Sequence, residues 1–239
     1  MRRPRGGLAG VISERGLDLN GSRWTRWAPL SGVVFVVLWL VTVALLNNAD
    51  TGDPDEKLTA YYANSGHRHR EVATFFLVLA ASLFFVWFLS VLRGRLARAQ
   101  GTAGGLTSAA FGAGLVSAGL WVVSLALFSA QSLARQDSSK FVFDANMFRM
   151  TQSVGYAVWF SATTIAAVAV VATAIVSLRF GGVLPKWIAW LSFVLAATML
   201  VAFFFVPFLI FLGWTLVVSL VLIWRSEQAV PAAQAAQAT

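Results

Sequence analysis

Long apolar stretches without charged side chains alternate along the chain with short polar segments. A helix needs about 20 apolar residues to cross a hydrocarbon core about 30 Å thick. Four stretches of suitable length contain no Lys, Arg, Asp or Glu, and each predicts a membrane-spanning helix. These four predicted spans cover residues 28–46, 72–92, 106–130 and 154–178.

The last apolar block is longer than one span requires. It runs without a charge from Trp187 to Trp224, which is 38 residues. A single helix of that length would measure about 57 Å, too long for an ordinary tilt to hide. We therefore expect two spans, 187–204 and 207–225, with Pro207 opening the second because a first-turn residue needs no donor. Six spans are predicted, and five with a long kinked last helix are the alternative.

The composition supports this pattern. Hydrophobic residues make up 58% of the chain, the mean hydropathy is +0.74, and only 12% of residues are charged. Soluble domains are about a quarter charged. The predicted fold class is all-α, a polytopic membrane helix bundle whose first partner is the lipid bilayer. Cysteine is absent, which excludes disulfides, iron–sulfur clusters and thiol nucleophiles.

The basic residues predict the orientation. Six spans would place twelve of the 18 Lys and Arg residues on one side, six of them before the first span. Basic residues mark the cytoplasmic side of a membrane protein. We expect a multi-pass protein of the cytoplasmic (inner) membrane, with both termini cytoplasmic. The net charge of +8 lies at span ends, so no nucleic-acid partner is predicted.

This orientation divides the chain into three parts. Residues 1–27 form a basic cytoplasmic segment, which we interpret as leading into an uncleaved first helix. Residues 28–225 form the six-helix transmembrane domain. Residues 226–239 form an Ala/Gln-rich cytoplasmic tail that we expect to be disordered.

Both predicted outer loops carry helix-start signals, so a short interfacial helix is expected in each. In the first, Asp53 is the expected cap residue and Pro54 the first helical residue, followed by two acids that suit the helix dipole. The second loop covers about 131–153. There Asp144 is expected to cap a short helix that continues into the fourth span.

The stretch GHRHRE, residues 66–71, raises the question of a metal site. His67, His69 and Glu71 alternate, so an extended backbone would point all three the same way. In a helix they do not share a face, two arginines lie between them, and no further His or Cys exists. We interpret the stretch as the polar start of a helix, and no metal or cofactor is predicted.

A ligand site is expected at the outer ends of the spans, because the spans themselves contain no Lys, Arg, Asp, Glu or His. Polar side chains there have a simpler alternative role, which is to cap helix ends and hold the loops. The candidate ligand-binding residues are Tyr61, Tyr62, Glu71, Gln131, Asp144, Arg149, Gln152 and Tyr156.

Spans three and four are rich in small residues. Ala110, Gly114 and Ala118 recur every four positions in span three, which lets helices approach closely. We interpret these faces mainly as packing surfaces within the bundle. The alternative is a homodimer or another membrane-protein partner held by the same faces.

The block DPDEKLTAYYANSGHRHREVATFFLVLAASLFFVWFLSVLRGRL, within residues 53–95, resembles small multi-pass bacterial integral membrane proteins of unknown function. In those proteins an acidic interfacial helix with a Tyr-Tyr pair precedes an apolar helix that ends in an arginine-rich turn. The resemblance implies a membrane topology and assigns no catalytic residue.

Three functional hypotheses follow. The first is a non-enzymatic membrane component or partner subunit that acts through helix packing. The second is a binder or carrier of an apolar small molecule in a pocket under the outer loops, which a cavity lined by Tyr61, Gln152 and Tyr156 would favour. The third is a lipid-modifying enzyme with Glu71 or Asp144 as acid or base, and no catalytic residue is assigned.

Overall fold

The computed structural model describes residues 27–46, 49–101, 104–138, 140–201 and 205–237, and it describes side chains as far as Arg225. These residues form eight helices and no strand. The helices are α2 (Leu30–Leu45), α3 (Asp55–Ala63), α4 (Ser65–Gln100), α5 (Gly105–Phe128), α6 (Ala130–Asp137), α7 (Ala145–Phe180), α8 (Lys186–Met199) and α9 (Val206–Gln237).

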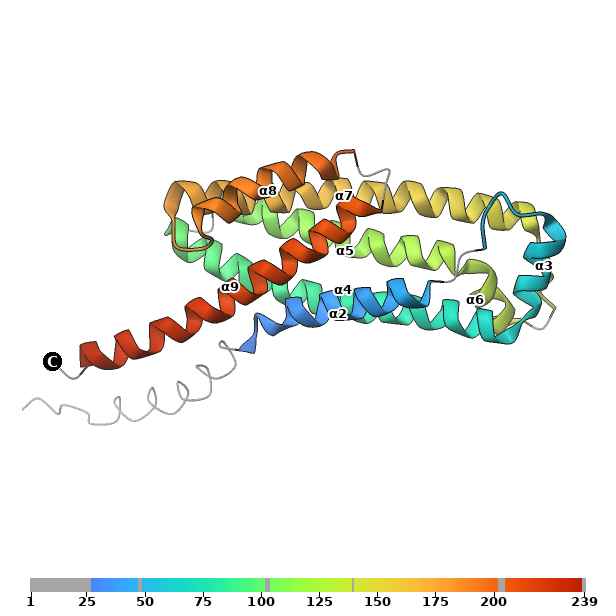
Figure 1. Ribbon diagram of the computed structural model, residues 1–239, viewed down its shortest axis with the longest axis horizontal. Coiled ribbons are helices and arrows are strands. Elements are labelled where there is room, and N and C mark those ends of the chain that lie inside the picture. The colour runs from blue at the N-terminus through green and yellow to red at the C-terminus, as the bar shows by residue number, and fades with distance from the viewer. Residues whose placement is uncertain (1–26, 47–48, 102–103, 139, 202–204, 238–239) are drawn as a thin grey trace, which may run out of the picture.

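The long helices α4, α5 and α7 run side by side along the length of the molecule (Figure 1). The short helices α3 and α6 cover one end, which we call the α3–α6 end. The start of α2 and the C-terminal part of α9 lie toward the opposite end. Six cations of the described residues lie at that opposite end, which we call the basic end. The six are Arg93, Arg95, Arg98, Arg179, Lys186 and Arg225.

The structure is that of a membrane-embedded helix bundle. Four helices are long and apolar enough to cross a bilayer: α4, α5, α7 and residues 206–225 of α9. The two other apolar helices, α2 and α8, have only 16 and 14 residues. At 1.5 Å per residue α8 is about 21 Å long, shorter than the hydrocarbon core.

The last apolar block is broken as the sequence predicts. Helix α8 ends at Met199, and α9 begins at Val206 with Pro207 in its first turn. The N–H groups of Leu200 and Val201 bond back to the carbonyls of Ala196 and Thr198 over 3.3 and 3.1 Å. Tight bonding at the helix end therefore satisfies backbone donors in a turn that has no polar side chain.

The structure covers the two predicted terminal segments only in part. The basic segment 1–27 lies outside the described residues except for Trp27. Helix α9 continues to Gln237 and so includes part of the tail 226–239, whose disorder stays a prediction. Ala and Gln are good helix formers, which favours continuing the helix beyond the apolar run.

The capping predictions have mixed outcomes. Asp144 caps α7 by accepting a 2.8 Å hydrogen bond from the Met147 N–H, as predicted. The prediction for Asp53 was wrong, because α3 begins at Asp55 and no side chain caps it. Asp53 instead accepts from Lys57 Nζ over 2.8 Å, and this ion pair holds its carboxylate away from the first-turn N–H groups.

The core is aromatic and depends on close helix approaches. Phe35 of α2 stacks on Phe85 of α4, with ring centroids 4.6 Å apart. Gly32 brings α2 so close to α9 that a Cβ there would lie 2.0 Å from Ser219 Oγ. The stripe Ala110, Gly114 and Ala118 is buried, and a Cβ on Gly114 would meet Leu89 of α4. The small residues of α5 thus serve packing inside the bundle, and the dimer stays a prediction.

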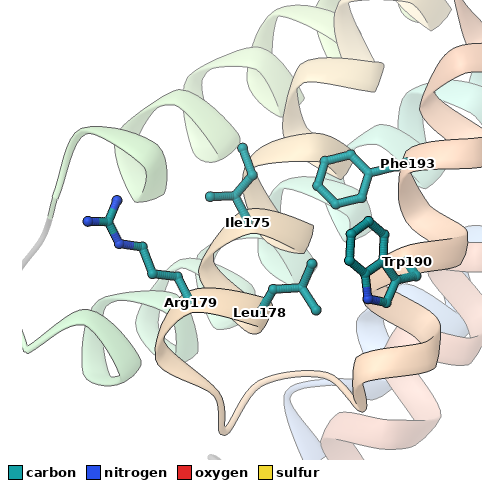
Figure 2. Close-up of a pocket in the computed structure, with 5 residues that line it drawn as sticks. All are labelled: Ile175, Leu178, Arg179, Trp190 and Phe193. Carbon is teal, nitrogen blue, oxygen red and sulfur yellow. The ribbon is translucent and has the colours of Figure 1, made fainter.

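Close to the basic end, a shallow hollow of about 340 Å³ lies between α7 and α8. Figure 2 shows four apolar side chains around it, with Arg179 to one side. Its lining residues are Ile175, Leu178, Arg179, Trp190 and Phe193.

Candidate functional site

A cavity of about 1080 Å³ lies at the α3–α6 end, between α2, α4, α5 and α7. It exists because α8 ends and α9 begins short of this end, so that fewer helices fill the bundle there (Figure 1). Phe205, directly before α9, lines the cavity, as does Trp39 near the middle of α2. The cavity volume is slightly above the usual range for small-molecule sites.

The deep part of the cavity is lined by aromatic rings. Trp39 and Trp159 meet edge to face with centroids 5.2 Å apart, and Phe205 stacks on Trp159 at 5.9 Å. Leu125 and Phe128 of α5 also line the cavity. This region offers apolar contacts that suit a hydrocarbon chain or ring.

The shallow part of the cavity is polar and centres on the Glu71 carboxylate. Tyr62 donates to its Oε1 over 3.0 Å, and Ser132 of α6 donates to its Oε2 over 2.6 Å. Tyr61 also hydrogen-bonds to Glu71. The backbone carbonyl of Glu71 accepts from Ser129 Oγ over 3.1 Å. One residue of α4 therefore holds α3, α6 and the end of α5 together.

The local sequence explains how the tyrosines reach this carboxylate. Asn64 ends α3 and starts α4, with its side chain accepting a 2.8 Å bond from the Gly66 N–H. Arg68 donates to the carbonyls of Tyr62 and Ala63 at the end of α3. The chain therefore turns sharply from α3 into α4 at Asn64. Tyr62 is held in place by stacking on Phe143, with ring centroids 4.7 Å apart.

This environment keeps both tyrosines protonated. Burial raises the pKa of Tyr61 to about 12, and the negative charge of nearby Glu71 adds to the effect. The pKa of Tyr62 is also raised, first by burial and then by Glu71. Both phenols are therefore hydrogen-bond donors over the physiological pH range.

The structure brings five of the eight candidate residues together. Tyr61, Tyr62, Glu71, Gln152 and Tyr156 all line the cavity. Gln152 also donates to the Phe128 carbonyl at 3.4 Å.

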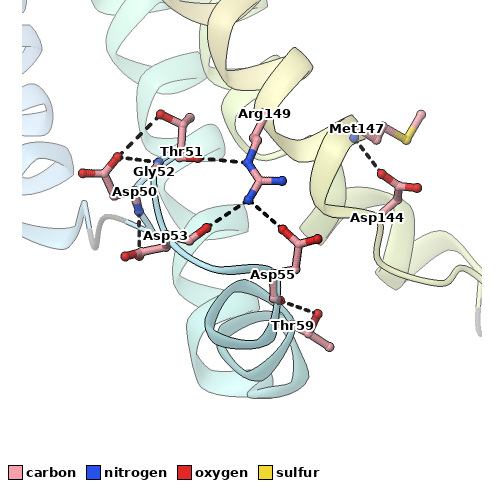
Figure 3. Close-up of polar contacts among 9 residues, drawn as sticks. All are labelled: Asp50, Thr51, Gly52, Asp53, Asp55, Thr59, Asp144, Met147 and Arg149. Atoms are coloured by element: carbon pink, nitrogen blue, oxygen red, sulfur yellow. Dashed lines mark hydrogen bonds and ion pairs between the residues drawn. The ribbon is translucent and has the colours of Figure 1, made fainter.

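The other three candidates lie elsewhere. Gln131 is buried and does not line the cavity, and its Oε1 has no hydrogen-bond donor among the described residues. Asp144 caps α7, and Arg149 binds the loop before α3 (Figure 3). Arg149 donates to the carbonyls of Thr51 and Asp53 over 3.0 and 2.9 Å. Asp144 and Arg149 therefore have the role of capping helices and holding loops.

The histidine motif is helical. Residues 65–70 belong to α4, so the side chains of His67 and His69 diverge. His67 stacks on Tyr61 with centroids 4.3 Å apart, and His69 is exposed. Among the described side chains, no three His, Asp or Glu groups are placed to hold a metal ion.

Sequence reasoning missed the apolar part of the site. The signal available was the placement of Trp39, which lies near the middle of the predicted span 28–46, whereas Trp159 lies close to the outer end of 154–178 and gave none. An indole at mid-span lies away from the interface that tryptophan favours. Phe205 gave no signal, since its role depends on where α9 begins.

Fold and cavity together define an all-α membrane protein with an amphipathic cavity at one end of its bundle. Comparisons with protein-family models, curated proteins and solved structures find no match for this chain. The resemblance noted for residues 53–95 therefore leads to no family assignment, and function has to be argued from the site.

Proposed function

We propose that this protein binds an amphipathic small molecule of the membrane in the cavity at its α3–α6 end. The observation that carries the proposal is the two-part lining. Trp39, Trp159 and Phe205 contact one end of the cavity, and Tyr61 and Glu71 line the other. A molecule with an apolar chain and a hydrogen-bonding head matches both parts.

The charged groups in the lining indicate the kind of head. Asp50 and Glu71 bring negative charge, and Arg70 brings positive charge. A strongly anionic head would meet the Glu71 carboxylate, and a strongly cationic head would meet Arg70. The lining is best suited to an uncharged or zwitterionic head with hydroxyl, amide or amine groups.

The ligand would enter from the side of the bundle. Helix α2 packs on α4 and α9, and it meets α7 through Trp39 and Trp159 at the deep part of the cavity, which leaves the two helices apart nearer the α3–α6 end. Leu46 and Tyr156 line the cavity and are also exposed on the outside of the bundle. A membrane-dissolved molecule can therefore pass between α2 and α7 without crossing the helices.

Glu71 is better suited to positioning than to acid–base chemistry. Its two carboxylate oxygens already accept bonds from Tyr62 and Ser132. A general acid or base needs an oxygen within reach of the substrate proton. This geometry favours a binder or carrier over the lipid-modifying enzyme.

The test is recovery of the ligand with the protein. Membrane-extracted protein is purified in mild detergent, and the small molecules bound to it are identified by mass spectrometry. Ala157→Trp fills the cavity, because Ala157 lines it. Val154→Trp is the matched control, since Val154 lies one turn earlier on α7, is exposed and does not line the cavity.

We expect a stoichiometric amphiphile with the parent and the Val154→Trp variant, and its loss from Ala157→Trp. No enriched amphiphile in any of the three would overturn the proposal and favour a partner subunit that acts through helix packing. Equal retention by all three folded proteins would show that the molecule binds elsewhere.

We further propose that all six apolar helices lie in the inner membrane with both termini cytoplasmic. Both ends of the described chain lie at the basic end, as cytoplasmic termini require. The chain has no cysteine, so single-cysteine variants can be labelled cleanly. An impermeant maleimide should label Glu56→Cys on intact cells or spheroplasts, and Arg98→Cys only after permeabilisation. Labelling in the reverse order would contradict this orientation.

The turn between α8 and α9 provides a test of the span count. Val201 is exposed in an apolar turn, and α8 alone is shorter than the hydrocarbon core. We expect Val201→Cys to resist the impermeant reagent from both sides, as a turn held within the hydrocarbon would. Labelling from the same side as Glu56→Cys would instead show two complete spans.

A further inference from the structure

The hollow between α7 and α8 has the features of a lipid-binding groove. Ile175, Leu178 and Phe193 line it with apolar surface, and Arg179 stands at its edge (Figure 2). Leu191 and Val194 on the same helix as Phe193 are exposed, so this side of α8 faces the lipid. A groove of this kind can hold a flexible lipid acyl chain that lies along the bundle.

Tryptophans place the groove at the level of the membrane interface. Trp187, Trp190 and Trp224 expose 63%, 64% and 60% of their surface near the basic end. Exposed indoles at one end of a membrane bundle mark the layer of lipid head groups. A lipid whose acyl chain lies in the groove would therefore have its head group beside Arg179.

Among the described side chains, the charge at this end is of one sign. All six cations of the basic end are described, whereas every described Asp and Glu side chain lies within residues 50–71 or 137–144, toward the α3–α6 end. Within the described part of the chain, Arg179 has a ring contact with Phe180 at 5.8 Å and no ion pair. The basic end thus lacks a protein counter-charge among the described residues.

We propose that the hollow between α7 and α8 binds an anionic phospholipid, with an acyl chain against Ile175, Leu178 and Phe193 and the phosphate at Arg179. The lipid supplies both the apolar filling and the missing negative charge. Lys186, exposed at the start of α8, adds a second cation near the same head group. This site is separate from the cavity at the α3–α6 end and does not depend on the function proposed for it.

A second copy of the chain fits this face less well. A symmetric dimer through α8 would bring two sets of the same cations together, with no described carboxylate to offset them. The phosphate of an anionic lipid would offset the positive charge of these cations directly. A dimer that buries the hollow is therefore an outcome that the experiment must detect.

The experiment is native mass spectrometry of the protein released from nanodiscs that contain equal amounts of phosphatidylglycerol and phosphatidylcholine. Arg179→Gln removes the proposed phosphate contact. Ile175→Trp fills the groove. Arg93→Gln is the matched control, because Arg93 lies at the same end but over Phe111 of α5, away from α8. Size-exclusion chromatography confirms that each variant is folded.

We expect the parent and Arg93→Gln to retain phosphatidylglycerol over phosphatidylcholine by more than about fivefold, because each interfacial cation supplies a preference of about that size. Arg179→Gln should lower the ratio by about fivefold and leave the part that Lys186 supplies. Ile175→Trp should lower the number of lipids retained. Equal effects of Arg179→Gln and Arg93→Gln would overturn the proposal in favour of diffuse charge. A dimer that Ile175→Trp dissociates would overturn it in favour of a protein interface.

Discussion

Tyr62 donates its phenolic hydrogen to Glu71 Oε1 over 3.0 Å, and this bond joins the short helix α3 to the first turns of α4. The same carboxylate accepts from Ser132 of α6, so both short helices are attached to one side chain. The packing of the two short helices and the lining of the cavity therefore depend on the same side chains. The residues that close the α3–α6 end are also the residues that line the polar part of the cavity.

Removing the phenolic hydroxyl of Tyr62 should destabilise this end of the bundle. Tyr62→Phe removes one of the donors to a largely buried carboxylate, which costs about 1–3 kcal/mol. The measurement is thermal unfolding in detergent, followed by tryptophan fluorescence. Tyr156→Phe is the control, because Tyr156 is exposed, and a change within about 0.5 kcal/mol is expected for it. Equal losses in both variants would contradict the special role of Tyr62.

Alkaline pH should weaken the same region. Burial and the Glu71 charge raise the pKa of Tyr61 from 10.0 to about 12, and the pKa of Tyr62 is raised as well. The stabilisation is complete below pH 10, where folded and unfolded forms are both protonated, and is lost as the pH rises from 10 toward 12. Tyrosinate absorbance should therefore increase at higher pH in the folded protein than after unfolding. Coinciding titration curves would disprove the burial of these phenols.

Arg149 should control the order of the loop before α3. Its guanidinium binds the carbonyls of Thr51 and Asp53 and the Asp55 carboxylate, as Figure 3 shows. Arg149→Gln removes these three contacts, and hydrogen exchange over residues 50–56 should become about tenfold faster.

Asp55→Asn tests how much of the Arg149→Gln effect comes from the ion pair alone. It weakens only the exposed ion pair at 2.7 Å, which is worth at most about 1 kcal/mol. Exchange should then increase by about fivefold or less. If Asp55→Asn matched Arg149→Gln, the two backbone contacts would contribute nothing.

The approach of α2 to α9 should tolerate no side chain at Gly32. An added Cβ would lie 2.0 Å from Ser219 Oγ and 2.7 Å from the Phe88 ring. Gly32→Ala should cost about 1–3 kcal/mol in unfolding free energy, and adding Ser219→Ala should recover part of it. Gly119→Ala is the control, because no atom lies within 4 Å of a Cβ there, and it should be neutral or stabilising. Similar losses at both glycines would show that helix packing is not the cause.

Much of the fold could be predicted because lipid imposes a simple pattern. The absence of charge over long stretches identified the four long apolar helices, and Pro207 marked the break before α9. Asp144 was recognised as a cap because its side chain acts on the nearby backbone. Such local signals depend on few neighbours, so a single sequence is sufficient to read them.

The cavity could be predicted only at its polar end. Tyr61, Glu71 and Gln152 attracted attention because polar groups near a membrane are few. Its apolar wall could not be found, because the order of residues does not state how far α8 and α9 extend toward the α3–α6 end. Asp53 shows the same limit, since its cap role was lost to a competing bond with Lys57.

Helix α9 connects the cavity with the loop between α7 and α8. Phe205, just before it, lines the cavity, and Arg225 donates to the Gly182 carbonyl in the loop between α7 and α8 over 2.6 Å. Because a single helix joins the two regions, any shift of α9 along its axis would alter the cavity wall at Phe205 and the Arg225–Gly182 contact at the same time.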